Sequence, residues 1–124
     1  MTALLAAGAS MSATTIAAPA APAAANPLTL PWTGPYGGVP PFDRVKVEDF
    51  APALEAAMAD ELANVEQIAN DPSPPTFDNT IAALERSSRM SERVQTVFWI
   101  YTSTMNDKAV QAVEREMAPK LAAH

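Results

Sequence analysis

Apolar residues in the latter part of the chain recur every three or four positions, the spacing of one face of an α-helix. The first such run covers residues 47–69. Its apolar positions are Phe50, Leu54, Ala57 or Met58, Leu62, Val65 and Ile68 or Ala69. Prolines at 72, 74 and 75 follow, and prolines cannot continue a helix. The pattern therefore predicts one amphipathic helix over 47–69.

A second apolar pattern begins after these prolines. Thr76 is positioned as an N-cap, with Asp78 in the first turn, and apolar residues recur from Phe77 to Tyr101. The middle of this region, residues 86–93, is polar, so the pattern is compatible with one helix or with two. Glu85 and Arg89 are spaced i, i+4, which favours a continuous helix only slightly.

A third helix is predicted after Asn106 or Asp107, either of which can cap it. Its stripe consists of Val110, Val113 or Ala109, Met117 and Leu121, and Pro119 is expected to kink it. The fold class is all-α: antiparallel helices, two long and one shorter or truncated. No cap or polar tail follows Leu121, so the sequence looks interrupted there.

Two different segments precede the helices. Residues 26–46 are rich in proline, glycine and aromatic residues, which predicts an extended segment. Residues 1–25 are an Ala/Pro-rich leader that resembles the later part of a signal peptide, although no Lys or Arg precedes its apolar run. Two interpretations remain: an exported, periplasmic protein whose start lies upstream, or a cytoplasmic one with a disordered leader. Residues 47–124 form the helical domain.

The charge and composition of the chain limit the kinds of partner that it is expected to bind. It carries eight basic and 14 acidic residues, a net charge of −6, and all of them lie at or after Asp43. Nucleic acid is not expected as a partner because phosphate binding needs a basic surface. The chain has no cysteine, so disulfides and thiolate metal sites are excluded. The apolar run near Met1 is too short to span a bilayer, and the helices are acidic, so no membrane partner is expected.

Residues able to carry chemistry are few. The one histidine, His124, is the last residue, and no H-E-x-x-H motif is present. The adjacent carboxylates Glu48-Asp49 and Asp60-Glu61 diverge by about 100° on a helix. Ser87, Ser88 and Ser91 have no nearby histidine, and Gly37-Gly38 resembles a turn. No catalytic, cofactor-binding or metal residue is assigned.

The run from Val97 to Tyr101 is continuously apolar within a helical context, so this helix is expected to be covered on all sides. Trp99, Phe98 and Tyr101 suit a core or an interface better than a ligand pocket.

Four stretches together resemble the beginning of a known family of enzymes. They are YGGVPPFDRVK at 36–46, PTFDNTI at 75–81, ALERS at 83–87 and PKLAAH at 119–124. In this order and spacing they are similar to the bacterial peptidyl-dipeptidases (dipeptidyl carboxypeptidases), within the thimet-oligopeptidase-like zinc metallopeptidases. The resemblance covers roughly residues 26–124.

This resemblance implies a longer, almost wholly helical parent enzyme whose halves enclose a channel. Its zinc would be held by a downstream H-E-x-x-H helix, and it would release dipeptides from the C-terminal end of short peptides. None of those site residues has a counterpart here, so the chain would be a channel wall that is inactive alone. Its Val97–Tyr101 run would then expose apolar surface, because the helices that cover it would be absent. Its partners would be the downstream catalytic part and, for the parent, short peptides.

The resemblance also implies a structural role for the extended segment, residues 26–46. It would be a strap anchored across the helices by Trp32, Tyr36 and Phe42, whereas a flexible linker would leave these aromatics exposed. The alternative function is a self-contained exported module that binds a protein through Val97–Tyr101.

Overall fold

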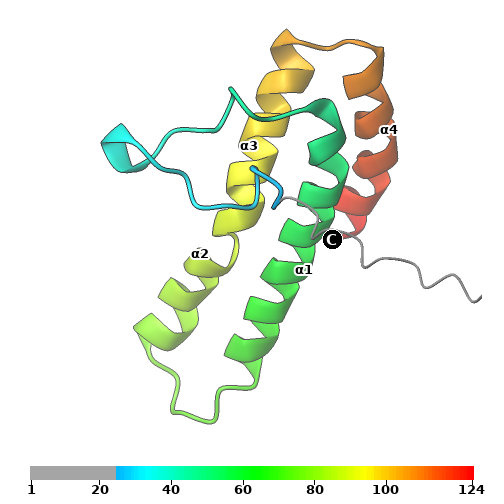
Figure 1. Cartoon of the computed structure of the whole chain (residues 1–124). Helices are drawn as coiled ribbons and strands as arrows, with labels where there is room; N and C mark the ends of the chain where they lie inside the picture. The colour runs from blue at the N-terminus through cyan, green and yellow to red at the C-terminus, as the bar shows by residue number, and fades with distance from the viewer. Residues whose placement is uncertain (1–24) are drawn as a thin grey trace, which may run out of the picture.

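The computed structural model describes residues 25–124, which form a helical hairpin with a further helix beside it (Figure 1). The α-helices are α1 (Phe50–Ala69), α2 (Ala83–Ser87), α3 (Arg89–Thr104) and α4 (Lys108–Ala123). Short helical turns η1 (Pro35–Gly37), η2 (Val47–Asp49) and η3 (Phe77–Ala82) complete the set. The all-α prediction is confirmed for these residues. The leader predicted at 1–25 lies outside the described residues, apart from Ala25.

Local side-chain hydrogen bonds begin the helices. The Lys46 amide donates to the Asp49 carboxylate at 2.8 Å, which starts the turn η2 ahead of α1. Asp107 accepts from the amides of Ala109 and Val110, both at 2.9 Å, and so caps α4. Of the two expected caps, Asp107 is therefore the one used. Pro119 does not interrupt α4, which continues through it to Ala123.

The second helical region is divided into three pieces. Thr76 caps it as expected: its hydroxyl accepts from the Asn79 amide at 3.1 Å, and its own amide donates to the Asn79 side chain at 2.7 Å. The first turn, η3, is a π-helix, and α2 follows it directly. The helix breaks at Ser88, which answers the question of one helix or two. No ion pair joins Glu85 to Arg89 among residues 25–124, so that pair does not hold the helix straight.

The core lies where the first half of α1 faces α3 and α4. The Phe50 ring packs against Phe98 and Tyr101 with centroid distances of 5.1 and 4.8 Å, in tilted and edge-on geometries. The buried apolar residues are Leu28, Phe50, Ala53, Leu54, Ala57, Val94, Val97, Phe98, Tyr101, Val110 and Met117. The predicted stripe of α4 is confirmed, since Val110 and Met117 are buried and Val113 and Leu121 pack beside them.

The strap adds one fully buried side chain to this core. Leu28 is inserted among the helices, and the Asn26 side chain donates to the Asp49 carbonyl at 2.8 Å. Trp32 also packs against the core, as expected. The expected anchor at Tyr36 is wrong, because this side chain is fully exposed, and Phe42 is about half exposed. Tyr36 has a φ of 59° within η1, where the strap loops away from the helices (Figure 1).

The expected turn at Gly37-Gly38 is confirmed. Both residues have positive φ, and the Val39 amide donates to the Thr33 carbonyl at 3.1 Å to close the loop. Gly38 is required sterically as well, since a Cβ placed on it would lie 2.7 Å from the Trp32 carbonyl oxygen.

The hairpin divides into two halves. The proximal half comprises residues 50–57 of α1, α3, α4 and the strap, and the distal half comprises residues 58–69 of α1, η3 and α2. Every buried residue of α1 lies within residues 50–57. In η3 and α2 the only buried residue is Ser87. The core therefore occupies the proximal half alone.

Candidate functional site

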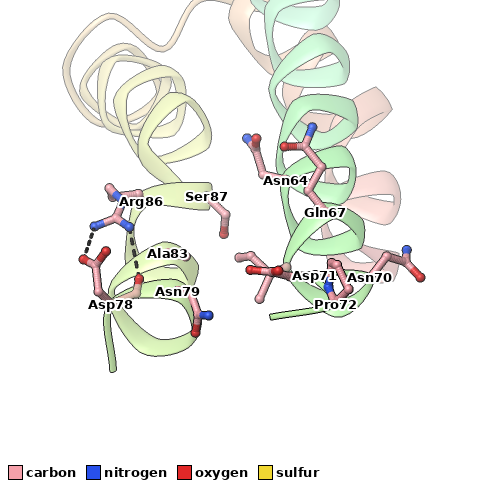
Figure 2. A pocket seen from close by; sticks show the side chains of 11 residues that line it. Asn64, Gln67, Asn70, Asp71, Pro72, Asp78, Asn79, Ala83, Arg86 and Ser87 are labelled. Atoms are coloured by element: carbon pink, nitrogen blue, oxygen red, sulfur yellow. Dashed lines mark hydrogen bonds and ion pairs between the residues drawn. The ribbon is translucent and has the colours of Figure 1, made fainter. Parts of the chain in front are cut away.

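A groove of about 720 Å³ separates the two arms of the distal half (Figure 2). One wall is the end of α1 and the other is η3 with α2. Its lining residues are Asn64, Gln67, Ile68, Asn70, Asp71, Pro72, Asp78, Asn79, Ala83, Arg86 and Ser87. Four carboxamides lie among them, and each supplies both a donor and an acceptor.

The charged groups of this groove are engaged by local partners. The Arg86 guanidinium donates to the Asp78 carboxylate at 3.4 Å and to the Asp78 carbonyl at 3.1 Å (Figure 2). The Ser73 amide donates to the Asp71 carboxylate at 2.9 Å, and this hydrogen bond lowers the pKa of Asp71. These contacts hold the ends of α1 and η3 in shape, and they leave no charged group of the groove arranged as a nucleophile with a base.

The adjacent carboxylates diverge, as the helix geometry predicts. Asp60 accepts from the Asn64 side chain at 3.1 Å, whereas Glu61 lies 3.3 Å from Nε2 of His124 at the end of α4. Glu48 and Asp49 face different groups of Lys46, its ammonium and its amide respectively. His124 thus lies at a helix end beside one carboxylate.

The three serines considered as nucleophiles are held by neighbours close to them in the chain. Ser87 donates to the Leu84 carbonyl at 2.7 Å, and Ser88 donates to the Glu92 carboxylate at 2.7 Å. The Ser91 hydroxyl accepts from the Gln95 side-chain amide (Nε2) at 2.7 Å. Each bond is within one or two helical turns, so these contacts shape the helices.

The described part of the chain offers neither a metal cluster nor a membrane span. Among residues 25–124, no three His, Cys, Asp or Glu side chains gather in a way that suits a metal ion. None of the helices within the same range combines the length and the apolar character needed to cross a membrane.

The apolar run Val97–Tyr101 is covered on one side only. Val97, Phe98 and Tyr101 are buried, but Trp99 is 69% exposed, so the run leaves apolar surface bare at Trp99, as expected if its covering helices are absent from this chain. Trp99 borders a hollow of about 250 Å³ between α3 and α4, whose lining includes Phe98, Trp99, Ala118 and Leu121. The Phe98 and Tyr101 rings face the core, as a core interpretation of these aromatics predicts.

Lys120 joins α4 to α1. Its ammonium donates to the Glu55 and Glu116 carboxylates, and these two hydrogen bonds raise the pKa of Lys120, with that to Glu55 contributing more. One turn further along the chain, His124 meets Glu61. The two contacts show that α4 runs in the same direction as α1.

Sequence reasoning missed the groove. The available signal was the spacing of Asn64, Gln67 and Asn70, which puts three carboxamides on one face at the end of α1, opposite Asn79. Nothing in the sequence indicates that α2 leaves space beside that face.

The fold and groove define a helical segment without assigned catalytic residues, and comparison with known proteins shows the class to which it is related. No family model matches the chain. Two curated relatives do: "Dipeptidyl carboxypeptidase" of Salmonella typhimurium is 34% identical over 98 residues, 79% of this chain. "Dipeptidyl carboxypeptidase" of Escherichia coli is 33% identical over 97 residues, 78% of this chain.

The predicted resemblance is therefore confirmed, and the chain is related to the dipeptidyl carboxypeptidases. The match spans 14% of the length of each of these two relatives. The chain is peptidase-related and corresponds to a minor part of each of these two relatives.

Proposed function

We propose that this chain is the amino-terminal helical part of a zinc metallopeptidase that releases dipeptides from the C-terminus of short peptides. It forms a section of the channel wall, and the chemistry belongs to the remainder of the enzyme. The observation that carries the proposal is the similarity of most of the chain to a small fraction of two dipeptidyl carboxypeptidases.

The distal half supports a role as part of a larger body. Phe77 is 75% exposed, and four other large apolar side chains of this half are at least one third exposed: Leu62, Val65, Ile81 and Leu84. This amount of exposed apolar side chain in one half of the hairpin favours contact with further polypeptide. Further polypeptide of the same enzyme is the partner that the relatives' greater length suggests.

The polar groove supports a place near peptide substrates. Carboxamides pair with both the N–H and the C=O groups of a peptide backbone, so the Gln67 side chain and the Asn64 side-chain oxygen suit an extended peptide, whereas the Asn79 carboxamide is already held by Thr76, Thr80 and Pro74. They do not depend on the identity of its side chains. A wall of this kind lets varied short peptides pass.

Zinc does not fit the donor set of the described residues. A catalytic zinc takes about three protein ligands, and His124 stands with one carboxylate, Glu61. The proposal therefore assigns the zinc ligands to the remainder of the enzyme.

A peptidase assay with two proteins tests the proposal. A full-length enzyme containing this sequence is expected to release dipeptides from a short peptide, and to stop when a chelator is added. The 124-residue chain with added zinc is expected to release none. Chelator-sensitive dipeptide release by the chain alone contradicts the channel-wall role, and inactivity of the full-length protein contradicts the peptidase assignment.

We further propose that the protein is exported, on the basis of the signal-like composition of residues 1–25. Mass spectrometry of the natural protein is expected to find a mature amino terminus near Asn26. A natural chain that retains the leader and fractionates with the cytoplasm contradicts export and favours the cytoplasmic alternative.

The alternative, a self-contained binding module, has one observation in its favour: the exposed Trp99 beside an apolar hollow. The proposed patch Val97–Tyr101 is weaker than its sequence suggests, because Val97, Phe98 and Tyr101 are buried in the core. A stable stoichiometric complex that forms with the isolated chain and is lost with Trp99→Ala would favour the module.

A further inference from the structure

The face of α1 that meets α4 continues beyond their contact. Met58, Leu62, Val65 and Ala69 are spaced by four, three and four residues, which places them on one stripe of the helix. Met58 is partly buried and packs against the core, whereas Leu62 is 55% and Val65 37% exposed. The stripe is thus covered at Met58 and only partly covered at Leu62 and Val65, which lie later in α1.

Two contacts between α1 and α4 show that α4 lies over this stripe. Lys120 reaches Glu55 on one side of Met58, and His124 reaches Glu61 on the other. On a helix with about 100° per residue, Glu55 and Glu61 lie about 120° apart, and Met58 projects midway between them. α4 and α1 run in the same direction, and α1 extends beyond the end of α4 (Figure 1). Because His124 at the end of α4 meets Glu61, the later residues Leu62 and Val65 follow the end of this contact along α1.

The charge beside the stripe repeats as well. Glu66 follows Glu55 by eleven residues, which returns it to the same edge of α1. Glu55 is paired with Lys120 of α4, while Glu66 has no ion-pair partner among residues 25–124. All four charged residues of α1 are acidic. A segment covering the later part of the stripe would therefore be complementary if it carried a basic residue at the corresponding position.

We propose that Leu62, Val65 and Ala69 receive a helical segment of the same polypeptide, lying in line with α4 and placing a basic residue opposite Glu66. This inference rests on the proposed function, since the segment comes from the part of the peptidase that the chain does not include. The continuity of the stripe with the existing α1–α4 contact selects this occupant over a second copy of the chain.

Thiol labelling tests the proposal directly, because the 124 residues contain no cysteine. Val65→Cys reports on the stripe, and Ala63→Cys, on an exposed face away from it, is the matched control. Both variants are made in the isolated chain and in the full-length peptidase, and mass spectrometry locates the maleimide.

In the isolated chain we expect both cysteines to react quickly. In the full-length enzyme we expect labelling at Val65→Cys to slow by at least about tenfold while labelling at Ala63→Cys is unchanged. Fast labelling of both positions in an enzyme that still releases dipeptides overturns the docking inference and leaves the proposed function intact. If the unmodified full-length protein releases no dipeptides, the proposed peptidase function is overturned instead.

Two more outcomes concern the occupant. Protection of Val65→Cys in the isolated chain that grows with protein concentration would show a second copy on the stripe and overturn the proposal. Glu66→Lys is expected to lower the Tm of the full-length enzyme but not of the isolated chain, whereas equal Tm values for the full-length variant and the unmodified enzyme contradict the basic partner.

Discussion

The proximal and distal halves of the hairpin are built from the same helix, α1, yet they differ in what covers them. In the proximal half Phe50 and Leu54 are buried against α3, α4 and the strap. In the distal half Leu62 and Val65 continue the apolar pattern with only partial cover, and a polar groove replaces the core. An amphipathic pattern therefore identifies the face of a helix that makes contacts. It does not show whether the contacting segment belongs to these 124 residues or to other polypeptide.

The largest expected effect is a loss of stability on substitution in the core of the proximal half, compared with a matched substitution in the distal half. Phe50→Ala removes the ring that contacts Phe98 and Tyr101 and is expected to cost about 3–5 kcal/mol in the free energy of unfolding. Phe77→Ala in the distal half is the matched control and is expected to change it by about 0.5 kcal/mol or less. Urea unfolding of the isolated chain measures both. Similar losses would show that the distal half has a core of its own.

The strap allows a second comparison between two leucines. Leu28→Ala is expected to cost about 2–5 kcal/mol because the side chain is fully buried. Leu30→Ala removes a side chain that is exposed to solvent and is expected to change the free energy of unfolding by about 0.5 kcal/mol or less. Thermal unfolding of the two variants measures both changes in stability. A Leu28→Ala variant as stable as the unmodified chain would mean that the strap is not part of the core.

The two N-caps sharpen the comparison further. Thr76→Ala and Asp107→Ala each remove a capping acceptor, at an expected cost of about 0.5–2 kcal/mol. Hydrogen exchange is expected to separate them: Thr76→Ala speeds exchange in η3 and α2 alone, whereas Asp107→Ala, whose helix contributes Val110 and Met117 to the core, speeds exchange throughout the proximal half. Identical exchange patterns would show one cooperative unit instead of two halves.

The smallest expected effect concerns the link between α4 and α1. The pKa of Lys120 is raised above 10.5 by its hydrogen bonds to Glu55 and Glu116. Its contribution to stability is complete below the unfolded value and is lost as the pH rises through the folded one. Lys120→Met is therefore expected to lower the Tm slightly near neutral pH and to match the unmodified chain at strongly alkaline pH. Lys108→Met, at the other end of α4, is the control; an equal response of both variants would contradict the assigned pair.

Local signals predicted the helices well. Thr76 and Asp107 are the N-caps that immediately precede η3 and α4. The apolar stripes of α1 and α4 follow from residue spacing alone. The sequence does not decide whether the helix breaks at Ser88, since a polar stretch is compatible with a straight or a broken helix. Interactions distant in sequence were not predicted: nothing near Leu28 indicates burial, and the anchoring role of Tyr36 failed because aromatic character does not set the direction of a side chain in a turn.

The candidate site was predictable only in its negative features. The absence of an H-E-x-x-H motif and the divergence of adjacent carboxylates follow from sequence and helix geometry. The groove depends on the distance between α1 and α2, which is set by packing elsewhere. The sequence therefore places the carboxamides of α1 on one helix face, but it does not show that they line a groove.

The burial of Leu28 has a consequence for synthesis on the ribosome. The strap leaves the exit tunnel before any helix, yet the core that receives Leu28 also contains Met117 of α4, the last helix of the described chain. Until α4 emerges, the core that buries Leu28 and packs against Trp32 is incomplete. These apolar side chains of the strap therefore stay exposed to solvent during translation. Such nascent chains are natural clients for factors that shield the newly made polypeptide.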